Sequence, residues 1–400
     1  MSALGRTDRY IIVGVGAFTV LAGLARYGHW SSILAFFFAT VALAGLAHVV
    51  AVGVESVGEL LGAGVAGFMQ ATLGNLPELF LVVFALRQGE AIVAQSTVIG
   101  SIFSNALLVL GIVIVVGARR TPDGVMRFGH RLANDTATLL IAATFIIVIV
   151  GLSLQTHDPA SSHVSTVSTV AAIGLLIVYL FWVVPYIRSS NSPSAEPSRT
   201  VPGDDPDTRS RVTRAEPLTQ GGVAVAEAPP AVAVAAEAEP EDDGMPHLPL
   251  KVGIVLLAIG GVGAAFVSDW FVTALAPTVD QLGISRAFAG LVIAAIAGNA
   301  VENITAVILA SKGQPDLAVS VVKNSVGQMA AFMWPALVLI SLPLTTKLTF
   351  SLHPVYIGAL LVTALAMWQI TGDGEAVAFE GLALIAIYLT LAGITLYETV

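Results

Sequence analysis

The chain has 400 residues, of which 56 % are hydrophobic and only 11 % are charged. Soluble globular chains carry about 25 % charged residues, and here the apolar residues come in blocks of about 18–25, long enough to cross a bilayer. This composition excludes an ordinary soluble domain and predicts an all-α integral membrane protein. The net charge of −9 comes largely from one polar segment and indicates no nucleic-acid partner. The absence of cysteine excludes disulfides, thiolate metal sites and thiol catalysis.

Eleven apolar blocks predict eleven transmembrane helices. In chain order they cover residues 9–26, 31–53, 65–87, 91–117, 134–153, 165–187, 249–275, 286–310, 315–341, 353–371 and 378–397. A segment rich in Pro, Ala, Ser and acidic residues separates the sixth block from the seventh, and it cannot bury enough apolar surface to fold alone. We therefore expect four parts: an N-terminal helix (1–28), a first five-helix unit (29–187), a flexible linker with an acidic run (188–247) and a second five-helix unit (248–400).

The distribution of Lys and Arg predicts the orientation, because basic residues favour cytoplasmic loops. Arginines precede the first block, are frequent in the loop after the fourth block and recur in the linker. The loops on the opposite side contain few Lys or Arg residues. The N-terminus and the linker are thus expected in the cytoplasm and the C-terminus outside.

An internal repeat is the most informative feature of the sequence. When the chain is shifted by 224 residues, "GNLPELF" at Gly74 falls on "GNAVENI" at Gly298 without a gap. The shift superposes Asn75 on Asn299, Glu78 on Glu302 and Ser101 on Ser325. The matched helices are five spans apart, an odd number, so the two halves would insert in opposite orientations. Inverted repeats of this kind are typical of secondary transporters, with the binding site between the halves at mid-membrane.

Glu78 and Glu302 are the first candidates for that site, because an ionisable group within a span is costly and usually functional. The motif Gly-Asn-x-x-Glu places the amide and the carboxylate on one helical face. Gly74 and Gly298 permit close approach of another backbone, and Pro77 indicates a helix break with exposed carbonyls, which a membrane tolerates only beside a cavity.

The following helices carry "GSIFSN" (Gly100–Asn105) and "NSVGQ" (Asn324–Gln328), which add hydroxyl and amide oxygens. Carboxylate, amide, hydroxyl and carbonyl oxygens suit a hard cation such as Ca²⁺, which takes about 6–8 oxygen ligands. If protons and the cation compete for the same carboxylates, and the gate moves only when both are neutralised, the chain works as an antiporter.

The two matched stretches resemble the signature repeats of the cation/proton exchanger branch of the calcium/cation antiporter superfamily. The resemblance covers most of both membrane halves but not the linker. It implies one extra N-terminal helix ahead of two inverted five-helix repeats, and exchange of Ca²⁺, or alternatively Mn²⁺, for protons. It also implies that Glu78 and Glu302 bind cation and proton in turn. Further ligands or hydrogen bonds would come from Asn75, Asn299, Ser101, Ser325, Asn105 and Gln328.

The second repeat departs from the family pattern. Asn303 stands where a histidine is usual, and Lys323 lies opposite Ile99 of the first repeat. Both are candidate modifiers of selectivity, since a lysine aimed at the site would leave a net charge of −1 and favour a monovalent cation. We expect instead that Lys323 snorkels to the cytoplasmic surface, because it lies about 140° around its helix from Gln328.

The sequence therefore predicts a proton-coupled cation antiporter of the plasma membrane, bacterial in origin, that needs no cofactor and is not an enzyme. A Na⁺/H⁺ or Na⁺/Ca²⁺ exchanger is the alternative within the same class. A cation channel would also place carboxylates at mid-depth, but it usually builds its pore from a symmetric oligomer. The expected partners are the cation, protons and lipid; a homo-oligomer is left open.

Overall fold

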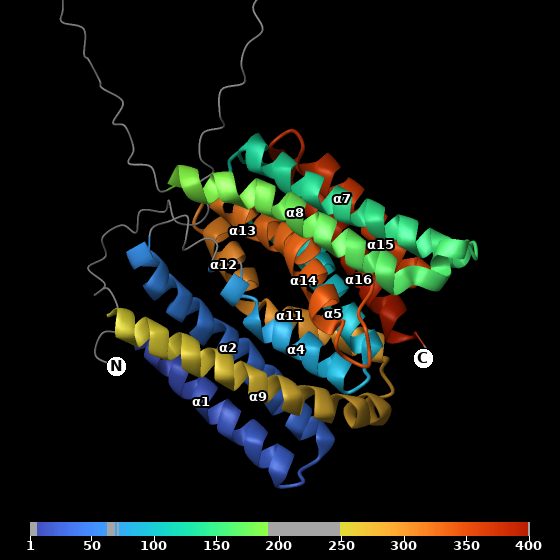
Figure 1. The fold of residues 1–400 in the computed structure, drawn as a ribbon. Helices are drawn as coiled ribbons and strands as arrows, with labels where there is room; N and C mark the ends of the chain where they lie inside the picture. Colours follow the sequence, from blue (N-terminus) through green and yellow to red (C-terminus); the bar gives the residue numbers. More distant parts are fainter. Residues whose placement is uncertain (1–5, 62–68, 70–71, 191–248, 399–400) are drawn as a thin grey trace, which may run out of the picture.

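The computed structural model describes residues 6–61, 69, 72–190 and 249–398. The expected linker and its acidic run lie almost entirely outside these residues, so nothing tests them. Nearly all of the described chain is α-helical, with two short strands. The helices run roughly along one direction in Figure 1 and form a bundle.

The first half contains the following elements: α1 (Arg6–Tyr27), α2 (Ser32–Leu61), α4 (Leu76–Arg87), α5 (Ala91–Phe103), η1 (Ser104–Val109), α6 (Leu110–Ala118), β1 (Val125–Arg127), α7 (His130–Gln155), η2 (Pro159–His163) and α8 (Val164–Ser190). The elements η1, η3 and η4 are π-helical, and η2 is a 3₁₀-helix.

The second half contains α9 (Leu250–Leu282), α10 (Arg286–Phe288), η3 (Ala289–Ala294), α11 (Ala295–Gly298), α12 (Ala300–Ser311), α13 (Pro315–Gln328), η4 (Met329–Met333), α14 (Trp334–Ser341), α15 (Pro354–Thr371), β2 (Glu375–Val377) and α16 (Ala378–Leu396). Both bounds of α12 lie 224 residues after those of α4, and α13 and α14 begin 224 residues after α5 and α6.

Within the described residues, 8 helices are long and apolar enough to cross a membrane, or 9 if the bent pair 286–311 counts as one span. All eleven expected blocks contain helix, but two do not meet this criterion. Residues 315–341 carry Asp316 and Lys323, and only the second part of 65–87, the 12-residue helix α4, is described as a continuous helix. The chain is a membrane protein, and the count of eleven spans stays a prediction.

The bundle has three parts in space, which Figure 1 shows. Helices α1, α2 and α9 lie side by side in contact with one another on one flank, and α7, α8 and α15 lie on the other. The broken helices α4, α5 and α11–α14 fill the middle. Small residues permit the close contact of α2 with α9: a Cβ on Gly53 would lie 2.8 Å from the backbone nitrogen of Leu257.

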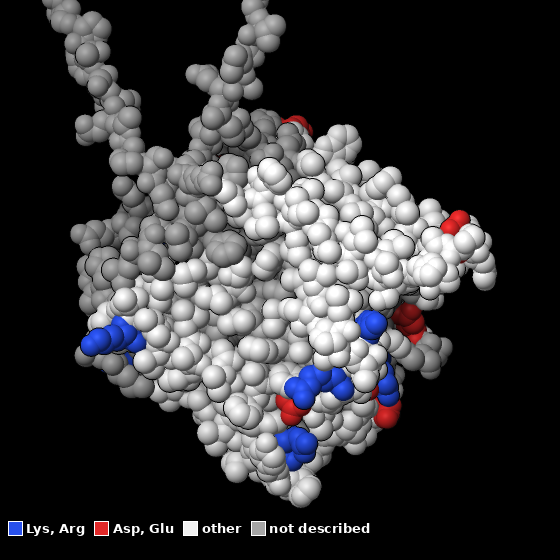
Figure 2. Space-filling model, in the orientation of Figure 1, with Lys and Arg blue, Asp and Glu red and all other residues white. Residues whose placement is uncertain are grey.

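The outer face is apolar, as a lipid-facing surface requires. Phe181, Phe145 and Phe266 are 77 %, 64 % and 57 % exposed, on the outward sides of α8, α7 and α9. The face in Figure 2 is mostly uncharged, with the described Lys, Arg, Asp and Glu residues near the helix ends. The described surface therefore agrees with burial in a bilayer.

A two-stranded antiparallel sheet joins the two halves at one end of the bundle. Strand β1 pairs with β2 so that Arg127 lies opposite Glu375, with a distance of 3.2 Å between Arg127 Nε and Glu375 Oε1. Arg127 also contacts Asp123, and its guanidinium holds the pKa of that exposed carboxyl below its usual range. The sequence analysis did not predict these strands, which are too short to show an alternating pattern.

Candidate functional site

Both candidate segments are broken helices, and the break falls on an asparagine. Asn75 has φ −90° and ψ 12°, and Asn299 has φ −96° and ψ 13°, so the backbone leaves the helical path at the same point of each half. In the second half the segments on either side of the break differ in direction by 62°. The break therefore recurs with the 224-residue shift.

Pro77 is not needed for this break. It occupies the first turn of α4, where an amide N–H would have no partner within the helix in any case. The equivalent position in the second half is Val301, yet that half breaks with nearly the same backbone angles. The backbone carbonyl of Pro77 accepts a hydrogen bond from the hydroxyl of Ser268 in α9, at an oxygen–oxygen distance of 3.4 Å.

Glu78 lies in the first turn of α4 and is only 1 % exposed. Its Oε1 accepts hydrogen bonds from the Ser101 hydroxyl of α5 and from Asn299 Nδ2, at 2.5 Å for the latter. Asn299 Nδ2 also contacts Ser101 Oγ at 3.0 Å. Residues from both halves thus hold one carboxylate, as the repeat predicted for a site between them.

The same network continues to the second glutamate. Asn105 Nδ2 donates to Asn299 Oδ1 at 3.3 Å and to Ser325 Oγ at 3.0 Å. The Ser325 side chain lies beside the carboxylate of Glu302, and the carboxylates of Glu302 and Glu78 are close enough to repel each other when both are charged. Six polar residues from the two halves of the chain therefore meet in one cluster.

The two glutamates differ in their access to the surface. Glu78 is fully enclosed, whereas Glu302 is partly exposed although its Oε2 atom is buried. The sequence repeat gave no reason to expect this difference, because it aligns the two positions without a gap.

Several oxygen atoms in this region have no hydrogen-bond partner among the described residues. They are Glu78 Oε2, Glu302 Oε2, Asn303 Oδ1, Asn324 Oδ1 and Ser104 Oγ. A buried oxygen without a partner is costly unless it binds something. The donor set is made of carboxylate, amide and hydroxyl oxygens, which suits a hard cation or protons. In the described part of the chain no three His, Asp or Glu residues are placed to hold a metal ion together.

The remaining predicted residues surround this cluster. Asn75 is 3 % exposed at the first break. Gly298 packs against Glu78: a Cβ at this glycine would lie 3.1 Å from both Cδ and Oε1 of Glu78. Gly74 is half-buried beside Asn75, and Gln328, also half-buried, ends α13. These positions agree with a site between the halves, but no ligand contact tests their roles.

The sequence analysis missed the π-helical turns η1 and η4, which follow α5 and α13 at matched places. Such turns occur often at functional sites. Asn105 lies in η1, whose first residue is the fully buried Ser104. The 224-residue shift pairs Ser104 with the candidate residue Gln328, and this pairing could have identified Ser104 as a further candidate.

Lys323 does not snorkel, so that expectation was wrong. The side chain is 0 % exposed, and its Nζ lies 2.5 Å from the hydroxyl oxygen of Thr371, the last residue of α15. The face of α13 that carries Lys323 turns toward another helix instead of toward lipid and water. A cation is favourable at a helix C-terminus, where the carbonyl groups carry partial negative charge.

This contact makes a prediction for stability. Lys323→Met should keep or raise the melting temperature in detergent, because an apolar side chain of similar size in place of a buried charge is often neutral or stabilising by about 1–4 kcal/mol. Thr371→Val should lower the stability by about 1–3 kcal/mol, because the ammonium then loses a hydrogen-bond acceptor. The melting temperatures of both variants are compared by thermal unfolding. A lower melting temperature for Lys323→Met than for Thr371→Val would contradict this account.

Known proteins share both the sequence pattern and the fold of this chain. The sequence profile of the family described as sodium/calcium exchanger protein matches residues 31–185 and 252–397. A Ca²⁺/H⁺ antiporter of Synechocystis is 28 % identical over 387 residues, covering 96 % of this chain and 97 % of the relative. The Ca²⁺/H⁺ antiporter ChaA of Bacillus subtilis is 27 % identical, covering 96 % and 98 %. The solved structure of native YfkE superposes with a TM-score of 0.73 at 24 % identity, over 97 % of this chain and 100 % of that one, and so supports the fold.

Proposed function

Because the chain belongs to the sodium/calcium exchanger protein family, we propose that it is a secondary antiporter that exchanges Ca²⁺ for protons across a membrane. One observation carries the proposal: a buried hydrogen-bonded chain runs from Glu78 through Asn299 and Asn105 to Ser325, whose side chain lies beside Glu302. The antiporter names of relatives that match nearly the whole chain support the choice of cargo.

In the proposed mechanism the two glutamates take cation and protons in turn. With both carboxylates ionised, Glu78 and Glu302 would repel each other, and a divalent cation between them would neutralise both charges. Protonation of both would remove the same repulsion and release the cation. Oxygen atoms of Ser101, Asn105 and Asn299 would complete the ligand set, provided that their present hydrogen bonds rearrange.

Alternating access would follow from the two inverted five-helix repeats. Broken helices with matched bounds, α4 and α12, face each other through the cluster. A rocking motion that exposes Glu302 on one side and Glu78 on the other is consistent with the difference in their exposure. We propose that the partly exposed Glu302 is the first to meet a cation from the open side.

The test uses the purified full-length protein in liposomes with a pH-sensitive dye and an imposed proton gradient. Addition of Ca²⁺ should discharge the gradient, because each arriving cation displaces protons from the glutamates. Na⁺, K⁺ and Mn²⁺ are added in separate runs. Discharge by Na⁺ but not by Ca²⁺ would refute the assigned cargo and favour the Na⁺/H⁺ alternative.

A further inference from the structure

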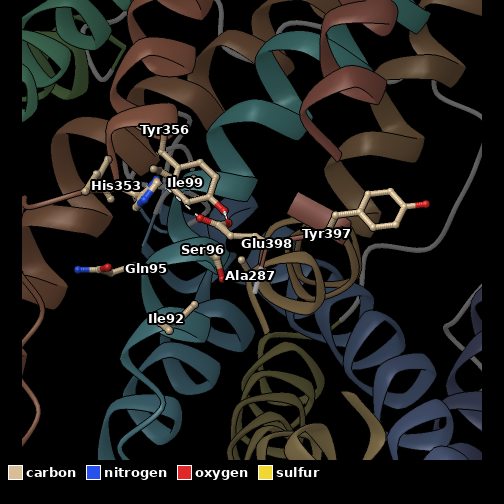
Figure 3. Close-up of a pocket in the computed structure, with 10 residues that line it drawn as sticks. Ile92, Gln95, Ser96, Ile99, Ala287, His353, Tyr356, Tyr397 and Glu398 are labelled. Atoms are coloured by element: carbon tan, nitrogen blue, oxygen red, sulfur yellow. Dashed lines mark hydrogen bonds and ion pairs between the residues drawn. The ribbon is translucent and has the colours of Figure 1, made fainter. Parts of the chain in front are cut away.

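A second cavity lies apart from the glutamate cluster, at the end of the bundle where α5 and α15 begin and α16 ends. Its volume is about 490 Å³, and Figure 3 shows its lining. The lining residues with polar side-chain atoms are Gln95, Ser96, His353, Tyr356, Tyr397 and Glu398; neither Glu78 nor Glu302 contributes to it. The proposed exchange reaction does not use this cavity.

Hydrogen bonds within the protein already use the hydroxyl hydrogens of Tyr356 and Ser96 and one amide hydrogen of Gln95. The Tyr356 hydroxyl donates to the Glu398 carboxylate, as Figure 3 shows. Ser96 donates to a backbone oxygen of its own helix at 3.2 Å, and the amide nitrogen of Gln95 donates to a backbone oxygen at 3.1 Å. What these side chains still offer is mainly lone pairs, so the cavity favours a ligand that donates hydrogen bonds.

The charge of the cavity favours a cation. The side chain of Glu398 is 25 % exposed, and the nearest basic group that contacts it is His353, with Nδ1 3.7 Å from Glu398 Oε1. Arg286, next to the lining residue Ala287, is already paired with Glu90 at 2.9 Å. A cationic ligand would thus gain the Glu398 carboxylate as its main partner.

A metal ion does not suit this cavity. Ca²⁺ takes about 6–8 oxygen ligands, whereas the lining has one carboxylate, and the described residues hold no metal-binding group of three His, Asp or Glu. Apolar side chains make up the rest of the wall, with Ile92, Ile99 and Leu352 among them. The ring of Tyr356 adds an aromatic face, to which organic cations are attracted. Apolar walls around a few polar groups are typical of sites for small organic molecules.

We propose that this cavity binds a small primary amine, whose ammonium group donates hydrogen bonds to Glu398 and Ser96 and whose apolar body packs against Ile92, Ile99 and Leu352. A primary ammonium has three donors and no acceptor, which complements a lining of acceptors. The proposal concerns binding alone and does not depend on the cargo or on the exchange mechanism.

The test is isothermal titration calorimetry of benzylamine into the full-length protein in detergent, at neutral pH in an amine-free buffer. Benzyl alcohol and benzyltrimethylammonium serve as probes of similar shape, the first without the charge and the second without N–H donors. Benzylamine should bind on the order of tenfold more tightly than either, because hydrogen bonds to charged groups contribute most. Equal binding of the three, or no binding of benzylamine, would overturn the proposal.

Two variants locate the binding. Glu398→Gln should weaken benzylamine binding on the order of tenfold or more, because it removes the charge that the ammonium contacts. Glu375→Gln is the matched control, since Glu375 is an exposed carboxylate at the opposite end of α15 and α16, and it should bind as the unaltered chain does. If Glu398→Gln does not fold, Ile99→Phe, which fills the cavity, replaces it. If the folded variant, Glu398→Gln or its replacement Ile99→Phe, binds benzylamine as the unaltered protein does, the site is refuted.

Discussion

Glu78→Gln is expected to abolish proton-coupled cation exchange, with a loss of about a hundredfold or more in rate, while the protein stays folded. Glutamine keeps the shape of the side chain and an oxygen for Ser101 and Asn299. It carries no charge and neither takes nor releases a proton, so one of the two carboxylates needed to hold a divalent cation is lost. Loss of one partner of a buried charge contact commonly costs about 2–5 kcal/mol of binding free energy, which corresponds to that factor in cation affinity.

The measurement is Ca²⁺-dependent discharge of a pH gradient in liposomes with equal amounts of protein. Glu375→Gln is the control, because it removes an exposed carboxylate whose ion pair with Arg127 contributes little. Glu302→Gln should fail in the same way as Glu78→Gln. Full exchange in either variant would remove that glutamate from the mechanism.

Gly298→Ala is expected to reduce transport by roughly tenfold or more, while the protein loses at most about 1–3 kcal/mol of stability and stays folded. The new methyl group would collide with the Glu78 side chain, whose Cδ and Oε1 would lie 3.1 Å away, so Glu78 must move and its bonds to Ser101 and Asn299 must lengthen. Alanine is a better helix former than glycine by about 1 kcal/mol, so the helix itself does not suffer.

The matched control is Gly393→Ala in α16, where a Cβ meets no atom within 4 Å. Initial rates of transport and thermal unfolding are measured for both variants. Gly298→Ala should transport slowly although it stays folded. Gly393→Ala should have the transport rate and the melting temperature of the unaltered protein. Equal transport rates in the two variants would show that the contact between Gly298 and Glu78 does not matter.

The sequence predicted the helical membrane fold, the two broken segments and most members of the polar cluster. It succeeded because an intramembrane glutamate is costly and rare, so that two of them in one repeated motif stand out against apolar residues. Both breaks fall on the paired residues Asn75 and Asn299, which were expected as ligands, whereas Pro77, which looked like the cause of a break, has no counterpart in the second half.

Other features depend on how the helices pack, which a linear pattern does not record. The chain of contacts from Glu78 through Asn299 and Asn105 to Ser325 crosses between the halves, and no spacing in either repeat predicts it. The expectation that Lys323 snorkels rested on its depth in the span and on its angle relative to Gln328. That angle is correct for a single helix, but it does not tell whether lipid or another helix, here α15, covers the face.

The most direct test of the proposed exchange is radioactive Ca²⁺ accumulation in liposomes, with an imposed pH gradient as the only energy source and the membrane voltage clamped at zero by potassium and valinomycin. The account predicts that Ca²⁺ inside rises above its outside concentration and that a proton-conducting ionophore abolishes the accumulation. It predicts no accumulation with Glu78→Gln. Equilibration of Ca²⁺ without accumulation would indicate a channel, and accumulation only with a sodium gradient would indicate a sodium-coupled exchanger; either result would contradict the account.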